Sequence, residues 1–592
     1  MSLPEQTSGR GALGARASGA WGRLRAQVRS SEVGLTLAAA VIGGVAGLMV
    51  MLMSRAVQWM HVLLFGIDLN ERLSGAARLA PLAVLAWPTV GGLLVGVSLW
   101  LGAKRGLAPA VDPIEANALR GGRMPVRDSL IVALQTLVSN GFGASVGLEA
   151  GYTQVGAGLA SAIGERLRLR RSDLRVLVGA GAAGAIAAAF GAPLTGAFYG
   201  FEVVIGAYSI ASVAPVMAAA LAGALLTQQI GGSLYHMDIH TSAGIKSLDY
   251  LLFAGLGVIC SLLAILLMRA VSTMERLFRQ PFIPPALRPA LGGLTVGVLA
   301  LATPQALSAG HGALEYDLAA TQGVAIVLGL LLVKMAASAI SLGSGFRGGL
   351  FFASLLLGAL AGQAFAQVLS MTGVISPDPT ASALVGMGAF AVAIVGGPLT
   401  MSFLVLETTG DYALTGAVLA ASVVSSLIAR ETFGYSFSTF RLHLRGESIR
   451  SAHDVGRIRS LTVGRLMRRD PPTLPAAASV QELRRRYPLG STQQLVLLDE
   501  HDHYAGMVSV AEAHASAADD TRVAADFATH ADDALTPAMN VKDAMASFDR
   551  VEAETLAVLD EERRVIGLLN ETFAIRRYAE ELDKSHRELI GE

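Results

Sequence analysis

Long apolar stretches, separated by short polar segments, fill the chain up to about residue 446. They begin near Val33, Leu82, Leu130, Val176, Ala207, Tyr250, Ala290, Val324, Phe352, Ala383 and Ala413. A helix needs about 20 mainly apolar residues to cross the hydrocarbon core of a bilayer. Several stretches reach this length, whereas others are shorter or are interrupted by Gly or Pro. We therefore predict an all-α polytopic membrane domain over residues 32–446, with broken helices around a site near the bilayer midplane.

The composition supports a membrane protein. Of the 592 residues, 53% are hydrophobic and 16% are charged. The formal net charge is zero, so the charge indicates no nucleic-acid partner. The single cysteine, Cys260, lies in an apolar run. A single cysteine cannot form a disulfide framework or a thiolate metal cluster within the chain, and its apolar surroundings favour a packing role.

Basic residues indicate the orientation. Residues 1–31 are polar and contain several arginines but no cleavable signal peptide, so we expect a cytoplasmic basic tail. The densest basic loops, 166–175 and 269–288, are also expected in the cytoplasm by the positive-inside rule. Both termini are then cytoplasmic, and the compactness of the chain favours a bacterial inner (plasma) membrane.

An internal repeat divides the membrane domain. Residues 191–202 and 396–407 share Gly, Pro, Leu, Thr, Phe and Glu at positions 205 apart. The glycines of 141–147 recur in 343–349, 202 positions later. These matches predict two homologous halves whose Gly-rich loops meet at one site. The sequence alone does not show that the halves are inverted, although transporters built from repeats make inversion our expectation. The predicted halves are about 80–235 and 290–440.

A lone carboxylate, Glu149, stands in the Gly-rich apolar segment 138–154. A charged side chain at membrane depth costs about 2.5–3.5 kcal/mol even on lenient scales, so it needs a function or a partner. The glycines let a helix break and expose N–H groups, which attract anions at a helix N-terminus. An ionised carboxylate can fill such a site and leave it when protonated. We therefore predict an anion site gated by Glu149; the alternative is a carboxylate satisfied by a neighbouring Arg or hydroxyl.

Beyond residue 446, charged residues replace the apolar runs. After a linker over 447–458, the segments 459–517 and 518–580 both contain Leu-x-x-Leu-Asp-Glu, at positions 61 apart. Each copy is expected to form a helix, two strands and a second helix. This pattern predicts a cytoplasmic α/β pair over 459–580, followed by a C-terminal tail over 581–592.

These motifs together resemble the CLC family of chloride channels and proton/chloride exchangers, with a pair of CBS repeats behind the membrane domain. Gly147-Leu-Glu149-Ala-Gly151 stands where the family has Gly-Arg-Glu-Gly-Pro. Gly349-Leu-Phe351-Phe-Ala353 stands where it has Gly-x-Phe-x-Pro. The resemblance implies a Glu149-gated chloride pathway and a homodimer with one pathway per subunit; for Phe351, plain core packing is the alternative. The anion-binding residues that it implies are Pro109, Gly147, Leu148, Leu350, Phe351 and Phe437.

Two departures from the family concern hydroxyl groups. Pro109 stands where the family's Gly-Ser-Gly-Ile-Pro loop has its anion-binding serine, and this proline resembles plant members that favour nitrate. Phe437 aligns with a family tyrosine, although a shift of a few residues would restore a hydroxyl. With fewer hydroxyl donors, we expect weak chloride binding and poor discrimination against nitrate.

A third departure concerns protons. Exchangers of the family carry a second glutamate where this chain has Val203, next to Glu202. We therefore expect a channel-like protein with weak or absent proton coupling. The alternative is a proton/anion exchanger that uses Glu202. Glu202 can also form a helix-end salt bridge, since the equivalent residue of the second repeat, Glu407, is a glutamate too.

Three further residues or motifs leave alternatives open. Arg347 can raise the local anion concentration, pair with an acid or extend to the surface, and Lys334 has the same alternatives. In the C-terminal pair, Gly506-x-x-Ser509-x-x-Glu512 resembles a nucleotide-binding pattern with Glu in place of Asp. Adenine-nucleotide binding and a structural dimerisation role both fit this motif. No other cofactor and no metal is expected.

Other function classes fit less well. The sequence has no P-loop, no His-Glu-x-x-His and no nucleophile elbow, so we do not expect an enzyme. A coupled solute transporter of another inverted-repeat fold would need Asp or Asn ligands at its helix breaks. A membrane-anchored sensor would need no polar group inside the bilayer.

Overall fold

The computed structural model describes residues 28, 31–231, 244–319, 322–373, 375–443, 461–515 and 521–590. The chain divides into two compact units, Met1–Asp454 and Val455–Glu592, which are described separately. The predicted linker over 447–458 and almost all of the predicted N-terminal tail lie outside the described residues. The finer domain boundaries given above stay predictions.

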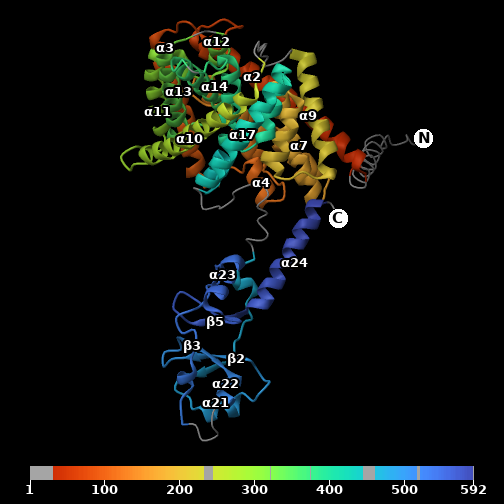
Figure 1. Cartoon of the computed structure of the whole chain (residues 1–592), viewed down its shortest axis with the longest axis vertical. Coiled ribbons are helices and arrows are strands. Elements are labelled where there is room, and N and C mark those ends of the chain that lie inside the picture. The colour runs from red at the N-terminus through yellow and green to blue at the C-terminus, as the bar shows by residue number, and fades with distance from the viewer. Residues whose placement is uncertain are drawn as a thin grey trace, which may run out of the picture. The chain divides into compact units, whose positions relative to one another are not determined.

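Unit 1 is built from helices, which confirms the predicted all-α membrane fold (Figure 1). In the described part of the chain, eight helices are long and apolar enough to cross a bilayer. The helices are α2 (Glu32–Phe65), η1 (Leu73–Gly75), α3 (Pro81–Lys104), α4 (Pro113–Leu119), α5 (Val126–Gly141), α6 (Glu149–Arg166), α7 (Arg171–Phe190), α8 (Pro193–Tyr199), η2 (Gly200–Ile205), α9 (Ile210–Gly231), α10 (Ser247–Phe278), α11 (Arg288–Ala302), η3 (Pro304–Ala306), α12 (His311–Ala319), α13 (Val324–Ser344), α14 (Phe351–Met371), α15 (Pro379–Val395), α16 (Pro398–Thr409), α17 (Tyr412–Thr432) and α18 (Phe437–His443).

The two halves of unit 1 are inverted. Helices α3 and α11 open the two predicted repeats and cross where their glycines bring the backbones together. Gly92 lies against the Pro289 carbonyl, and Gly96, further along α3, lies against the Ala286 carbonyl; Gly293 of α11 lies against α3 in the same way. Because the residue number falls along α11 as it rises along α3, the equivalent helices run antiparallel. A Cβ at Gly92 would overlap the facing carbonyl, so this crossing needs glycine.

A reciprocal pair of helix caps joins the same halves. The Glu202 carboxylate accepts hydrogen bonds of 2.7–3.0 Å from the backbone N–H groups of Leu399 and Thr400 and from the Thr400 hydroxyl, at the start of α16. The Glu407 carboxylate accepts the equivalent three bonds, of 2.7–2.8 Å, from Thr195 and the residue before it, at the start of α8. N–H groups and the helix dipole stabilise a carboxylate at such an end. Each half therefore caps a short helix of the other.

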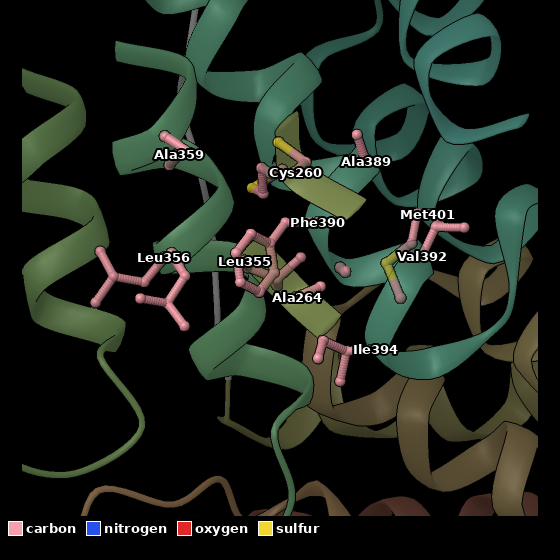
Figure 2. Packing of buried hydrophobic residues seen from close by; sticks show 14 of the residues in the cluster. Cys260, Ala264, Leu355, Leu356, Ala359, Ala389, Phe390, Val392, Ile394 and Met401 are labelled. Atoms are coloured by element: carbon pink, nitrogen blue, oxygen red, sulfur yellow. The ribbon is translucent and has the colours of Figure 1, made fainter. Parts of the chain in front are cut away.

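An apolar core fixes the helices of the second half. Figure 2 shows Leu355 of α14 and Phe390 of α15 packed around Cys260 and Ala264 of α10. Cys260 is fully buried, and its Sγ lies 3.7 Å from the Gly386 carbonyl oxygen. This placement supports a packing role for the cysteine. The same core holds α14, whose N-terminus belongs to the site described below.

Unit 2 has the predicted tandem of α/β copies. Strand β2 pairs with β1 in parallel and with β3 antiparallel, and β4 pairs antiparallel with β5. Asp499 after β2 and Asp560 after β4 each accept a backbone hydrogen bond of 2.8 Å, from His503 and Arg564, so the repeated aspartate fixes the turn between strands. The elements are α20 (Val463–Leu466), β1 (Thr473–Pro475), α21 (Val480–Arg486), β2 (Gln494–Leu498), β3 (Tyr504–Ser509), α22 (Val510–Ala515), η4 (Ala524–Phe527), α23 (Val541–Val551), β4 (Thr555–Leu559), β5 (Val565–Asn570) and α24 (Glu571–Ile590).

The reciprocal caps predict a stability effect. Glu202→Gln and Glu407→Gln each remove a charge that holds a helix N-terminus, and hydrogen bonds to charged groups contribute about 1.5–3 kcal/mol. We expect both variants to lower the thermal unfolding midpoint of the purified protein in detergent. Glu315→Gln, at an exposed glutamate of α12, is the control and should leave the midpoint unchanged. Equal midpoints for all four proteins would show that the caps do not stabilise the fold.

Candidate functional site

The two Gly-rich loops meet, as the repeat predicted. The Gly147 N–H donates to the Gly349 carbonyl at 2.8 Å, and the Gly349 N–H donates to the Gly147 carbonyl at 3.1 Å. Two residues beyond this bridge, α6 begins at Glu149 and α14 begins at Phe351. The bridge therefore brings two helix N-termini, one from each half, to the same place. Backbone N–H groups without partners inside their own helix are available at both ends.

A central cavity of about 140 Å³ adjoins these helix ends. Its lining includes the predicted residues Glu149, Leu350, Phe351, Phe437 and Val203. The structure thus brings together side chains that are nearly 300 positions apart in the sequence.

Three other predicted anion-site residues lie around the cavity without lining it. Pro109 is not among the lining residues, but Ala110 and Asp112, just after it, are. Gly147 forms the backbone bridge, and Leu148 faces a second cavity on the other side of Glu149. The side chains at positions 109 and 148 therefore lie outside the lining of the central cavity, where the sequence had placed them.

The Glu149 carboxylate separates the two cavities. It is 5% exposed and lines both the central cavity and the second one. Its carboxylate accepts backbone hydrogen bonds from its own N–H and from the N–H of Phe352, in the first turn of α14. Oε2 has no hydrogen-bond partner in the described part of the chain. A carboxylate at this helix end is held by the same N–H dipoles that would hold a small anion.

Aromatic rings surround the position beyond Glu149. The Phe351 ring lies 4.9 Å from the Phe190 ring and 6.1 Å from the Tyr199 ring, measured between centroids. Phe351 is thus packed, as the core-packing alternative held, and it also lines the cavity. Packing and lining are compatible here, because the ring edge can face the cavity while the body of the ring is buried.

Tyr199 is a hydroxyl that sequence reasoning missed. It lines the central cavity, where its hydroxyl hydrogen-bonds the Thr153 side chain. Ser438, next to Phe437, lines the cavity as well. The cavity therefore contains hydroxyls despite Pro109 and Phe437. A signal for Tyr199 was present, because the equivalent position of the second repeat holds the apolar Leu404.

Glu202 and Val203 occupy different surroundings. Val203 lines the central cavity, whereas Glu202 does not and caps α16 with three hydrogen bonds. These three contacts are those of a helix cap. They include no salt bridge, and they give no evidence for the proposed proton role.

Arginines mark the other end of the central cavity. Arg347 lines both this cavity and a wider one of about 530 Å³. The wider cavity is also lined by Arg276, Arg279, Arg288 and Arg441. Guanidinium groups gathered in one cleft raise the local anion concentration. Arg347 therefore faces both cavities, and the choice among its alternative roles stays a prediction.

Lys334 is fully buried and does not reach the surface. It is 1% exposed, and its Nζ donates to the carbonyl oxygens of Ser308 at 2.7 Å and Leu307 at 3.4 Å. In unit 2, the nucleotide candidates Ser509 and Glu512 lie at the junction of β3 and α22, where the Glu512 N–H donates to the Ser509 Oγ at 3.4 Å. This contact is a local turn and identifies no ligand.

Known proteins match most of the chain. Residues 91–430 match the family model described as voltage gated chloride channel. A chloride channel protein described as ClcB-like, from Ralstonia nicotianae, is 32% identical over 64% of this chain and 89% of its own length. The voltage-gated ClC-type chloride channel ClcB of Escherichia coli (strain K12 / DH10B) is 30% identical over 67% of this chain and 95% of its own.

Solved structures share the fold. A slow cyanobacterial Cl⁻/H⁺ antiporter superposes with a TM-score of 0.61 at 23% identity, over 69% of this chain and 97% of its own. A eukaryotic CLC transporter superposes with a TM-score of 0.57 at 17% identity, over 91% of this chain and 97% of its own. The family model spans more than half of the chain, and the matches cover most of the length of the relatives. This multi-pass integral membrane protein therefore belongs to the voltage-gated chloride channel (CLC) family.

Proposed function

We propose that the protein carries chloride and related small inorganic anions across a membrane through a pathway gated by Glu149, in a channel-like way with weak or absent proton coupling. One observation carries the proposal: the Glu149 carboxylate lies at the N-terminus of α14 and borders the cavities on both of its sides. A negative group at that position blocks the path and competes with an anion for the same N–H groups.

The gate follows from charge. An ionised carboxylate is held by the Phe352 N–H and by the dipole of α14, as a halide would be. Protonation removes most of that attraction, so the neutral side chain gives up the position and an anion can take it. The Gly147–Gly349 bridge keeps both helix ends in place while the side chain moves, because it is made by the backbone alone.

The weak-coupling part of the proposal is supported by two neighbouring residues. Val203 lines the central cavity and cannot carry a proton. Glu202 is engaged in the α16 cap, and its release would leave N–H groups of Leu399 and Thr400 without a partner. A proton/anion exchanger remains the second candidate, because the fold is shared with a Cl⁻/H⁺ antiporter.

Selectivity in this proposal rests on few hydroxyls. Phe437 lines the cavity and carries no hydroxyl, which supports weak chloride binding and tolerance of nitrate. The Tyr199 hydroxyl lies in the cavity and can turn from Thr153 to a bound anion. Pro109 and Phe437 have no hydroxyl to donate to the anion. We propose that the Tyr199 hydroxyl makes this contact in their place.

The remaining proposals concern the cellular setting. Both termini are proposed to be cytoplasmic, since the basic ends of α10 and α11 carry Arg276, Arg279 and Arg288. The relatives are bacterial, which supports an inner membrane. A homodimer with one pathway per subunit is proposed with the family membership.

Replacement of the gate predicts a change in pH dependence. Glu149→Gln is neutral at every pH, so we expect fast chloride efflux from liposomes that does not vary with pH, whereas wild-type efflux rises as the pH falls. A chloride electrode measures both. Glu165→Gln, a partly exposed carboxylate at the far end of the same helix, should behave like wild type. A Glu149→Gln variant with wild-type pH dependence would contradict the gate.

Proton coupling is tested directly by ion gradients. A chloride gradient across liposomes that contain the wild-type protein should drive no uphill proton movement, because Val203 supplies no proton-carrying group. A pH-sensitive dye records the internal pH, and a protonophore confirms that the dye responds. Proton movement in a fixed ratio to chloride would establish the exchanger instead.

The Tyr199 hydroxyl predicts an affinity change. Tyr199→Phe keeps the ring beside Phe351 and removes one donor to the anion, which should weaken bromide binding by about tenfold or more. Calorimetry on the purified protein measures the Kd. Tyr412→Phe, at a tyrosine that is 82% exposed, is the matched control. An unchanged Kd for Tyr199→Phe would remove the hydroxyl from the site.

A further inference from the structure

A second, basic cavity lies on the far side of Glu149 from the central cavity. Its volume is about 40 Å³, close to that of one water-sized or halide-sized guest. Its walls come from α2, η1, α5, α6, α7, α12 and the residues just before η1, α6 and α12, so residues from widely separated segments meet there. We call it the basic cavity; its polar lining residues include His61, Arg72, Ser74, Asn140, Ser308 and His311.

Positive and neutral groups dominate this cavity. Among its lining residues, Glu149 is the one carboxylate and Arg72 is the cationic residue, while His61 and His311 contribute buried imidazole rings. His61 is 5% exposed, and its Nε2 lies 3.0 Å from the Asn140 carbonyl oxygen. Basic groups buried at membrane depth are costly and as a rule mark an ion path. The arrangement is therefore suited to a negative guest.

Lys334 places a buried amino group behind the wall. Its Nζ donates to the carbonyl of Ser308, whose hydroxyl donates to the Asn140 Oδ1 at 3.2 Å. Its hydrogen bonds in the described part of the chain go to carbonyl oxygens, which solvate an ammonium group without cancelling its charge. Ser308 adopts a left-handed backbone with φ of 55°, a strained conformation for a serine. Such strain is typical of functional sites, and here Lys334 holds the strained carbonyl.

Two side chains are placed to hold the guest. Arg72 enters the cavity from the residue before η1, and its Nη1 lies 3.4 Å from the Gln58 Oε1. Gln58 is itself fixed, because its Nε2 donates to the Leu69 and Glu71 carbonyls. The Ser74 Oγ accepts hydrogen bonds of 3.1 and 3.2 Å from the N–H groups of two residues at the start of α12. The hydroxyl proton of Ser74 is therefore left to donate into the cavity.

We propose that the basic cavity is a second anion-binding site, which takes one small monovalent inorganic anion through the Arg72 guanidinium and the Ser74 hydroxyl, with Lys334 supplying further positive potential. The inference rests on the proposed function, since an anion held here would be the next to pass Glu149. It differs from the central site, which is built from helix N-termini on the other side of the gate.

Bromide is the probe, because its anomalous scattering locates it in crystals of the full chain. In Glu149→Gln crystals grown in bromide, we expect one peak at the N-terminus of α14 and one beside Arg72. Adding Arg72→Gln should remove the second peak and keep the first. Arg72→Lys, which keeps the charge, should retain both, and Arg78→Gln, an exposed arginine of the same loop, is the control.

Flux gives an independent measurement in case one variant fails to crystallise or fold. Arg72→Gln should raise the half-saturating chloride concentration for efflux by about tenfold at one fixed pH, with Arg72→Lys and Arg78→Gln near wild type. A peak at α14 with none beside Arg72 in the parent crystals would overturn this inference alone. The absence of bromide from both positions would overturn the proposed function as well.

Discussion

The backbone bridge between Gly147 and Gly349 is the constraint on which the site depends. It forces two helices to begin side by side, so the backbone N–H groups of their first turns converge on one point. Glu149 is the first residue of one of these helices, and its carboxylate reaches the first turn of the other. A residue with a Cβ at position 147 would collide with this carboxylate, so the glycine serves the gate as well as the bridge.

Reciprocal contacts hold the rest of the membrane unit to the bridge. The crossing of α3 with α11 and the mutual caps of Glu202 and Glu407 each join equivalent parts of the two halves. Contacts of this kind repeat themselves by symmetry, as they do in a two-fold dimer. One sequence repeat therefore specifies both sides of each interface, and the Gly147–Gly349 bridge is the same kind of contact. Glu202 and Glu407 are the two side chains that form these caps.

Several features could be predicted from the sequence because they are local or repeated. The offset between residues 141–147 and 343–349 predicted that the two loops meet, and the repeated Asp499 and Asp560 predicted the tandem strands of unit 2.

Inversion required the structure, since a repeat in sequence carries no direction in space. Tyr199 was missed because its helix is too short for a periodic pattern, so its one signal was the contrast with the apolar Leu404 of the second repeat. The basic cavity was missed for a different reason: Arg72, His61, His311 and Lys334 come from four segments whose proximity depends on tertiary packing. Lys334 alone was noticed, as a charge in an apolar run, but its partners were carbonyl groups that no sequence pattern reveals.

The central claim is that the Glu149 carboxylate and an anion compete for the same N–H groups. Calorimetric titration of bromide into wild-type protein and Glu149→Ala at neutral pH tests it most directly. Removing the carboxylate should leave the N-terminus of α14 to the anion and lower the Kd by about tenfold or more. Equal Kd values for the two proteins would contradict the competition, and with it the account of the gate.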